Sequence, residues 1–153
     1  MVYAVALVSL IAIFLNHCRD RLNLFWLAYL VGTLGVYAMF PYFPSEPPRT
    51  AFPGADMPRV TTAIREFNLF IVGGYGIHSS VFPSAHVSSA LSAAWGLLAA
   101  IPKRRWIGWS MFAYGILVAI ATVYGRYHYA ADGLAGIAVS LVALAMLRIR
   151  TRY

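Results

Sequence analysis

Residues 81–86, Val-Phe-Pro-Ser-Ala-His, include residue types that can bind an anion and transfer a proton. Pro83 suits the first turn of a helix, because its φ is fixed and its missing N–H would have no partner there. Ser84 and Ala85 would then present free backbone N–H groups at the positive end of the helix dipole, which attracts anions. His86 follows in the same turn. We therefore expect a proton donor beside an anion site at this helix start.

His128 and Asp132 form a second pair whose spacing suggests chemistry. They are four positions apart, so on a helical turn their side chains share a face. The carboxylate can accept the N–H of one ring nitrogen, which leaves the other nitrogen as a base, nucleophile or metal ligand. A purely structural His–Asp pair at a membrane interface explains the spacing equally well. For His86 alone, an ordinary histidine at a helix start is the simpler interpretation.

The composition indicates which solvent surrounds these residues. Hydrophobic residues make up 61% of the 153 positions and charged residues only 11%. Such a chain has too little charge to cover a surface that faces water, so we expect an integral membrane protein. The net charge of +7 comes from short basic clusters between apolar runs, so we expect no nucleic-acid partner. The single cysteine, Cys18, excludes an internal disulfide and a multi-cysteine metal site.

Apolar runs predict the helices that must position the histidines. They cover residues 2–15, 22–43, 83–101, 106–124 and about 133–147. We predict an all-α, polytopic membrane bundle of about five transmembrane helices that forms one domain over residues 1–153. The first run is short for a span, so a complete homologue is expected to have six helices. Residues 2–15 would then be the end of a helix that begins earlier.

A proline-rich segment separates the second run from the third. Residues 44–60 contain five prolines and are predicted to form an interfacial loop rather than a spanning helix. Residues 61–72 are predicted to form a short helix in the interface, with Arg65 and Glu66 on its water side.

The distribution of basic residues predicts the orientation in the membrane. If each run crosses once, segments 16–21, 102–105 and 148–153 share one side and contain eight of the twelve basic residues. The positive-inside rule places this side, with the C-terminus, in the cytoplasm. Both histidine motifs then fall on the extracytoplasmic face.

The two motifs together resemble the type 2 phosphatidic acid phosphatase superfamily, and within it the branch that includes inositol phosphorylceramide synthases. The matching segments are Phe-Pro-Ser-Ala-His at 82–86 and Val-Tyr-Gly-Arg-Tyr-His-Tyr-Ala-Ala-Asp-Gly-Leu-Ala-Gly at 123–136. The resemblance covers roughly the C-terminal half. It implies that His128 is the nucleophile that takes the phosphoryl group and that Asp132 orients it. It also implies that His86 is the general acid and later the base, and that Ser84 binds phosphate.

The chain departs from the family pattern in its arginines. Thr122 stands where the family's third motif has arginine, and the first motif, Lys-x6-Arg-Pro, is absent. Pro-Pro-Arg at 47–49 stands in the region of that first motif and resembles the synthase-like branch. Phosphoryl transfer needs positive charge on the equatorial oxygens, so Arg49 and Arg126 are the candidates for binding phosphate, with Arg65 behind them. Each is equally explained as an interfacial arginine that contacts lipid headgroups.

These observations predict a metal-independent phosphatase or phosphotransferase that acts on a lipid phosphate or phospholipid through a phosphohistidine, with no cofactor. The sequence does not distinguish hydrolase from transferase. The alternative is a non-enzymatic member that retains the fold and binds lipid or acts as a scaffold. A zinc site built from His78, His86, His128 and Asp132 would leave the anion site unexplained. Ser84 lacks the Gly-x-Ser-x-Gly context of a serine-hydrolase nucleophile.

Overall fold

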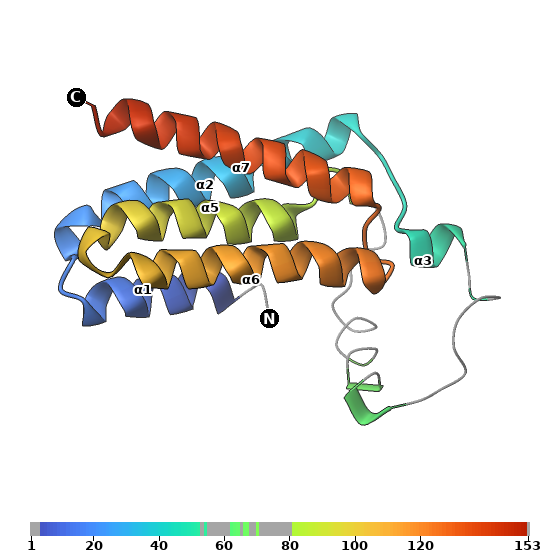
Figure 1. Ribbon diagram of the computed structural model, residues 1–153. Helices are drawn as coiled ribbons and strands as arrows, with labels where there is room; N and C mark the ends of the chain where they lie inside the picture. The colour runs from blue at the N-terminus through green and yellow to red at the C-terminus, as the bar shows by residue number, and fades with distance from the viewer. Residues whose placement is uncertain are drawn as a thin grey trace.

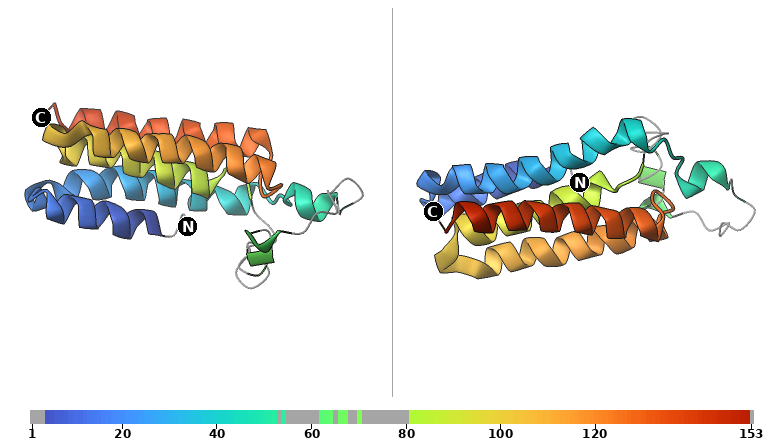
Figure 2. Two further views of the ribbon diagram at one scale, coloured as in Figure 1. Left: turned by 60° about the horizontal axis from the view of Figure 1, so that its bottom comes forward. Right: turned by 90° about the horizontal axis from the view of Figure 1, so that it is seen from above.

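The computed structural model describes residues 4–52, 54, 62–64, 66, 67, 70 and 81–152, and the regular elements within them are all helices (Figure 1). The bundle consists of α1 (Val5–Leu15), α2 (Leu22–Met39), α5 (Ala85–Ala100), α6 (Arg105–Tyr124) and α7 (Ala130–Arg150). Figure 2 shows these helices running alongside one another in an elongated bundle. The predicted all-α membrane fold is confirmed.

Three of the helical segments are long and apolar enough to cross a membrane. They run from Arg19 to Tyr42, from Pro102 to Tyr124 and from Ala130 to Arg150. The first two include short 3-10 turns, η2 (Arg19–Arg21), η3 (Phe40–Tyr42) and η4 (Pro102–Arg104). The remaining two, α1 and α5, are apolar but have only 11 and 16 residues.

Helix α5 lies at the centre of the bundle because its side chains are small. It contacts α1, α2, α6 and α7, and eleven of its sixteen residues are buried. Small residues allow helix backbones to approach closely in a membrane, where dispersion contacts and interhelical hydrogen bonds replace the hydrophobic effect. The Ser88 hydroxyl donates to the Gly32 carbonyl of α2 at 2.8 Å, and Thr33 Oγ1 lies 3.0 Å from Ser89 Oγ. These contacts hold α2 against α5.

The start of α5 is joined to the start of α7 through the backbone. The Ser84 N–H donates to the Asp132 carbonyl at 2.9 Å. One turn further along α7, a Cβ on Gly136 would lie 2.6 Å from the Ser84 carbonyl oxygen, closer than real Cβ contacts permit. A glycine is therefore required at 136 for the two helix starts to meet.

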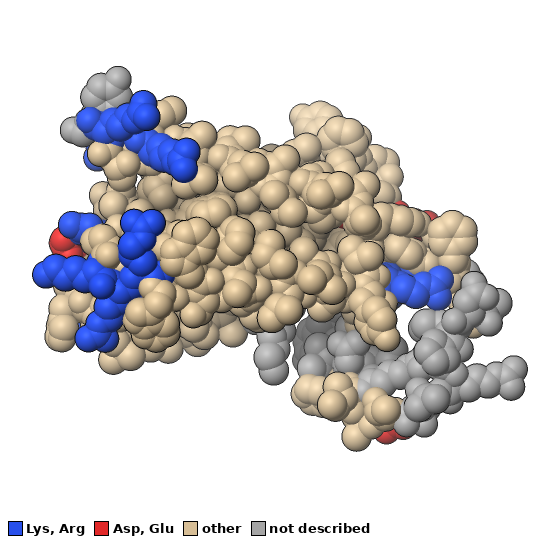
Figure 3. Space-filling view, in the orientation of Figure 1, with Lys and Arg blue, Asp and Glu red and all other residues tan. Residues whose placement is uncertain are grey.

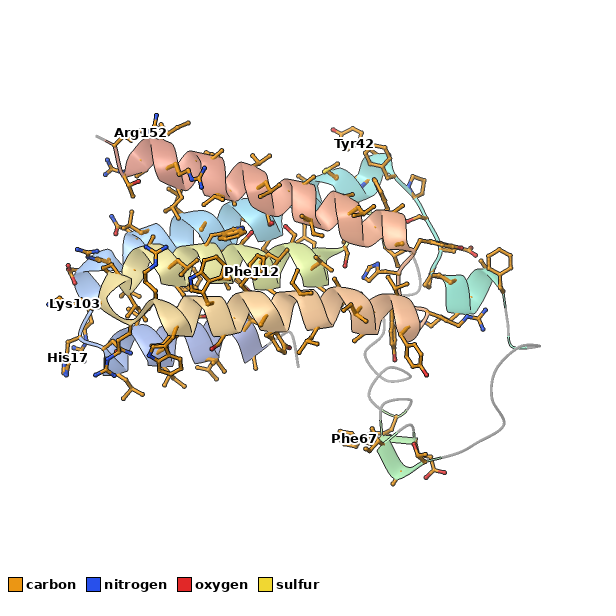
Figure 4. All side chains as sticks on the ribbon, in the orientation of Figure 1. His17, Tyr42, Phe67, Lys103, Phe112 and Arg152 are labelled. Atoms are coloured by element: carbon orange, nitrogen blue, oxygen red, sulfur yellow. The ribbon has the colours of Figure 1, made fainter. Side chains whose placement is uncertain are left out.

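Lysine and arginine side chains gather at one end of the bundle (Figure 3). Figure 4 labels His17, Lys103 and Arg152 at this end, and Tyr42 and Phe67 at the other. The two ends correspond to the two groups of connecting segments that the charge pattern separated. We call the first the basic end; its position in the cytoplasm stays a prediction.

The structure corrects two predicted boundaries. The segment predicted as an interfacial loop contains one helical turn, α3 (Pro48–Ala51), because Pro47 is extended and Pro48 occupies the first helical position. The final helix begins at Ala130, three residues earlier than predicted, and continues to Arg150. Arg65 and five other positions of the predicted interfacial helix at 61–72 lie outside the described residues.

Replacing Gly136 with alanine should destabilise the protein by roughly 1–3 kcal/mol, because the new methyl group overlaps the Ser84 carbonyl and forces α5 and α7 apart. Thermal unfolding in detergent, followed by circular dichroism, measures the change. Gly133→Ala is the matched control, since a Cβ at 133 meets nothing within 4 Å. Equal melting temperatures for the two variants would contradict the close approach.

Candidate active site

The first histidine of the site, His86, is held by the capped start of α5. Ser84 is the N-cap, and its hydroxyl accepts the Val87 N–H at 3.5 Å. Pro83 therefore lies one residue before the cap, joined to Phe82 by a cis peptide bond, and not in the first turn as predicted. Ala85 is the first helical residue and His86 the second.

The Ser84 backbone N–H is not available to an anion, contrary to the prediction. It donates to the Asp132 carbonyl, and the residue is fully buried. Any contribution of Ser84 to phosphate binding would have to come from its hydroxyl group. The Ala85 N–H remains at the positive end of α5, where the prediction placed it.

His128 and Asp132 form a buried pair beside this helix start. His128 Nδ1 lies 3.3 Å from Asp132 Oδ2, and the two residues are only 5% and 3% exposed. The same Oδ2 accepts the Tyr129 N–H at 2.9 Å. The pairing was predicted on a shared helical face, but His128 precedes α7 and Asp132 lies in its first turn. The two side chains meet because the chain turns into the helix between them.

The two histidines are in direct contact although 42 positions separate them. His86 Nδ1 lies 3.3 Å from His128 Nε2, and the ring centroids are 5.5 Å apart. Asp132, His128 and His86 therefore form a continuous chain of polar contacts. This chain links the first turn of α7 to the first turn of α5.

The surroundings of His128 keep its ring neutral near pH 7. Burial lowers the pKa of His128 below its usual 6.5, which outweighs the opposing effect of the Asp132 carboxylate and a backbone hydrogen bond at Val81. The guanidinium of Arg49 lowers the pKa further. A neutral ring that donates Nδ1–H to Asp132 has its lone pair on Nε2, directed at His86. Nε2 is thus prepared to act as a nucleophile or base.

Arg49 reaches the site from α3, which lies just beyond the end of the bundle at which α6 and α7 are connected (Figure 1). Its backbone N–H donates to the Arg126 carbonyl at 3.1 Å. Its guanidinium carbon lies 4.6 Å from the ring centroid of Tyr127, the residue before His128. This anchoring holds a positive charge beside the histidine pair.

Arg126, the second candidate for binding phosphate, has a different contact. It adopts a left-handed backbone conformation with φ 60°, and its Nη2 donates to the Phe52 carbonyl just after α3. The side chain thereby ties the loop to the α6–α7 connection. Its binding of phosphate stays a prediction.

One positioning residue was missed from the sequence. The Ser45 hydroxyl accepts the backbone N–H groups of Val81 and Phe82, each at 3.1 Å, and so anchors the segment that enters α5. Nothing in the spacing of Ser45 indicates this role, because the contact spans 36 positions. His78, the further ligand of the alternative zinc site, lies outside the described residues.

Comparison with known proteins gave one match. The family model described as the PAP2 superfamily matches residues 1–146, which include α1, α2, α5, α6, most of α7 and all three residues of the polar chain. Searches among curated proteins and among solved structures found no match.

His128 should titrate below pH 6.5, and Asp132→Asn should lower its pKa further, because the carboxylate is what favours the charged ring. Histidine-labelled protein in micelles, titrated by NMR, gives the pKa from the ring carbon shift, and a His128→Gln spectrum assigns the signal. A His128 pKa above 6.5 in the parent protein, or a rise in Asp132→Asn, would contradict the described environment.

Proposed function

The chain belongs to the PAP2 superfamily, and from that premise we propose that it transfers the phosphoryl group of a membrane lipid through a phosphohistidine intermediate. Membership by itself indicates phosphatase-type lipid phosphoryl transfer. The observation that carries the finer proposal is the chain of contacts Asp132–His128–His86, with 3.3 Å at each link. His128 is the neutral nucleophile, with the orienting carboxylate of Asp132 on one side of its ring and the proton carrier His86 on the other. Two successive displacements require this arrangement.

In the first step, His128 Nε2 attacks the phosphorus and the bond from phosphorus to the lipid oxygen breaks. His86 enters as the imidazolium, which a bound phosphate dianion favours, and gives its proton to the departing oxygen. Asp132 holds Nδ1–H and stabilises the positive charge that develops on the phosphorylated ring. The products are a lipid alcohol and phosphohistidine.

In the second step, a hydroxyl group attacks the phosphohistidine. His86, now neutral, takes the proton of the attacking water or lipid hydroxyl as its oxygen bonds to phosphorus, and the bond between phosphorus and Nε2 breaks. Water yields inorganic phosphate, and a lipid hydroxyl yields a new phospholipid. Hydrolysis and transfer to a lipid would thus use the same residues of the site.

Fixed positive charge is available for the transition state, which spreads negative charge over the equatorial oxygens. The first turns of α5 and α7 both lie at the histidine pair, so the positive ends of two helix dipoles meet there. We assign phosphate binding to the Ala85 N–H, the Ser84 hydroxyl and the arginines. Arg49 is the better placed arginine, since Arg126 already donates to Phe52. No metal or other cofactor enters the proposed steps.

Substrate binding must separate the two histidine rings. Their nitrogens are 3.3 Å apart, whereas a phosphorus atom about 3 Å from Nε2 has to fit between the nucleophile and the proton carrier. The His86 ring therefore lies where the phosphoryl group would have to bind. A rotation of the His86 ring away from His128 would open that position.

The proposed substrate is a lipid phosphate or phospholipid at the extracytoplasmic face, with the C-terminus in the cytoplasm. The distribution of basic residues supports this orientation. The Pro-Pro-Arg segment at 47–49 supports placement in the branch that includes inositol phosphorylceramide synthases. We treat residues 1–153 as one domain, because α5 contacts each of the other bundle helices.

Replacing His128 with alanine should abolish phosphate release from phosphatidic acid by purified protein in detergent, because no nucleophile remains. Asp132→Asn should slow release by about 10²–10⁴-fold, since the ring loses its orienting carboxylate. His17→Ala, at the basic end, is the control and should keep full activity. The assay contains EDTA, and near-parental release by a folded His128→Ala protein would rule out the mechanism.

Replacing His86 with alanine should strongly slow the release of phosphate from phosphatidic acid. It should slow the release of p-nitrophenolate from p-nitrophenyl phosphate far less, because that leaving group needs no proton in the first step. The phosphoenzyme should then accumulate, because the second step lacks its base. Quenching in alkaline detergent, followed by detection of a protein-bound phosphate that is stable in alkali and lost in acid, measures the phosphohistidine. Equal slowing with both substrates, without accumulation, would show that His86 is not the proton carrier.

A further inference from the structure

A cavity of about 280 Å³ lies between α5, α6 and α7 at the basic end, away from the histidines. Trp95, Trp109, Leu144, Arg105 and Arg148 contribute to its lining. Arg148 is sixteen positions beyond Asp132 on α7, which corresponds to about 24 Å along the helix. The cavity and the proposed active site are therefore separate.

The two arginines give the cavity a positive charge that no acidic side chain balances. Neither Arg105 nor Arg148 forms an ion pair within the described part of the chain. Asp20 is the single acid in the segments of the basic end, and it pairs with Arg21 at 3.8 Å. Guanidinium groups present several donors in a planar fork that matches a phosphate group. The charge thus favours a phosphate-containing ligand.

The remaining lining is aromatic and aliphatic. Trp95 and Trp109 both line the cavity, and both pack against Phe112, with ring centroids 5.2 and 5.5 Å from the Phe112 centroid, so the two tryptophans form one aromatic wall. Trp95 Nε1 is buried and has no hydrogen-bond partner within the described residues, which leaves a donor for a ligand oxygen. A small soluble anion would gain little from such a wall.

The cavity adjoins surface that faces lipid. Helix α6 packs against α5, whereas α7 packs against both α5 and α2. Helices α6 and α7 touch each other little, and the cavity lies between them. Exposed apolar side chains, among them Leu141 and Met146 of α7 and Trp109 of α6, cover this part of the bundle. An acyl chain can lie here while its headgroup reaches the arginines.

We propose that this cavity binds the phosphate headgroup of an anionic phospholipid from the leaflet at the basic end. Its volume is slightly below the ~300–1,000 Å³ of pockets that enclose drug-sized ligands, which suits a headgroup whose acyl chains remain outside. Basic pockets between transmembrane helices are known sites for anionic headgroups. The lipid is a bound ligand there and not a substrate, since the lining contains no histidine, cysteine or carboxylate, and its one hydroxyl, that of Thr151, donates to the Arg148 carbonyl.

The test titrates the purified chain of residues 1–153 in detergent with dioleoyl phosphatidylglycerol or dioleoyl phosphatidylcholine and counts bound lipids by native mass spectrometry. We expect phosphatidylglycerol to bind about tenfold more tightly than phosphatidylcholine, and the Arg105→Gln/Arg148→Gln protein to lose at least tenfold in affinity for it. The matched control, Arg150→Gln/Arg152→Gln, removes the same charge from the same end outside the cavity. It should bind phosphatidylglycerol within about twofold of the parent.

Three results would overturn the proposal. Equal losses in the two double variants would show only general attraction to basic residues. Equal affinity for the two lipids would exclude headgroup recognition, and displacement of phosphatidylglycerol by inorganic phosphate would indicate a simple anion site. The histidine site is intact in every variant, so it cannot cause a difference between them. If the double variant does not fold, each single substitution repeats the comparison, with several-fold losses expected.

Discussion

The hydrogen bond from the Ser84 N–H to the Asp132 carbonyl is the contact on which the rest of the site depends. The two bonded residues are 48 positions apart and lie at the starts of α5 and α7, and the glycine at 136 permits the backbones to come that close. Asp132 has a second task in the same place, because its carboxylate accepts from both His128 and the Tyr129 N–H. A buried carboxylate is costly unless it is paired and hydrogen-bonded, so one residue stabilises the junction and orients the ring.

The bundle separates packing from chemistry along its length. Small residues of α5 carry the packing, with Ser88 bonded to Gly32 and Leu91 close to Gly115. The polar groups of the site lie only at the end where α5 and α7 begin. This division lets helix dipoles, an arginine and two histidines converge without placing charge in the middle of the membrane, where it would be expensive. Eight of the twelve basic residues belong to the segments of the opposite end, where charge can anchor the protein to lipid headgroups.

Membership in the PAP2 superfamily gives this arrangement its functional meaning. The two arginines near the site have different contacts. Arg49 is brought to the histidines by a one-turn helix and by its contact with Tyr127. Arg126 instead secures the loop that carries Arg49, through Phe52 and through its own carbonyl. A charge that is distant in sequence is thus held beside the histidines.

The sequence by itself determined the all-α membrane fold, because apolar runs of spanning length and clustered basic residues are local patterns that the bilayer imposes. It also pointed to His86, His128 and Asp132, whose residue types and spacing carry chemical meaning. Tertiary structure alone decided how they meet. The Ser84 N–H is satisfied by Asp132, His128 lies outside the helix that holds its partner, and Ser45 anchors the entry to α5. The contacts of Ser84 and Ser45 join residues remote along the chain and depend on how closely two backbones pack, which no local pattern encodes.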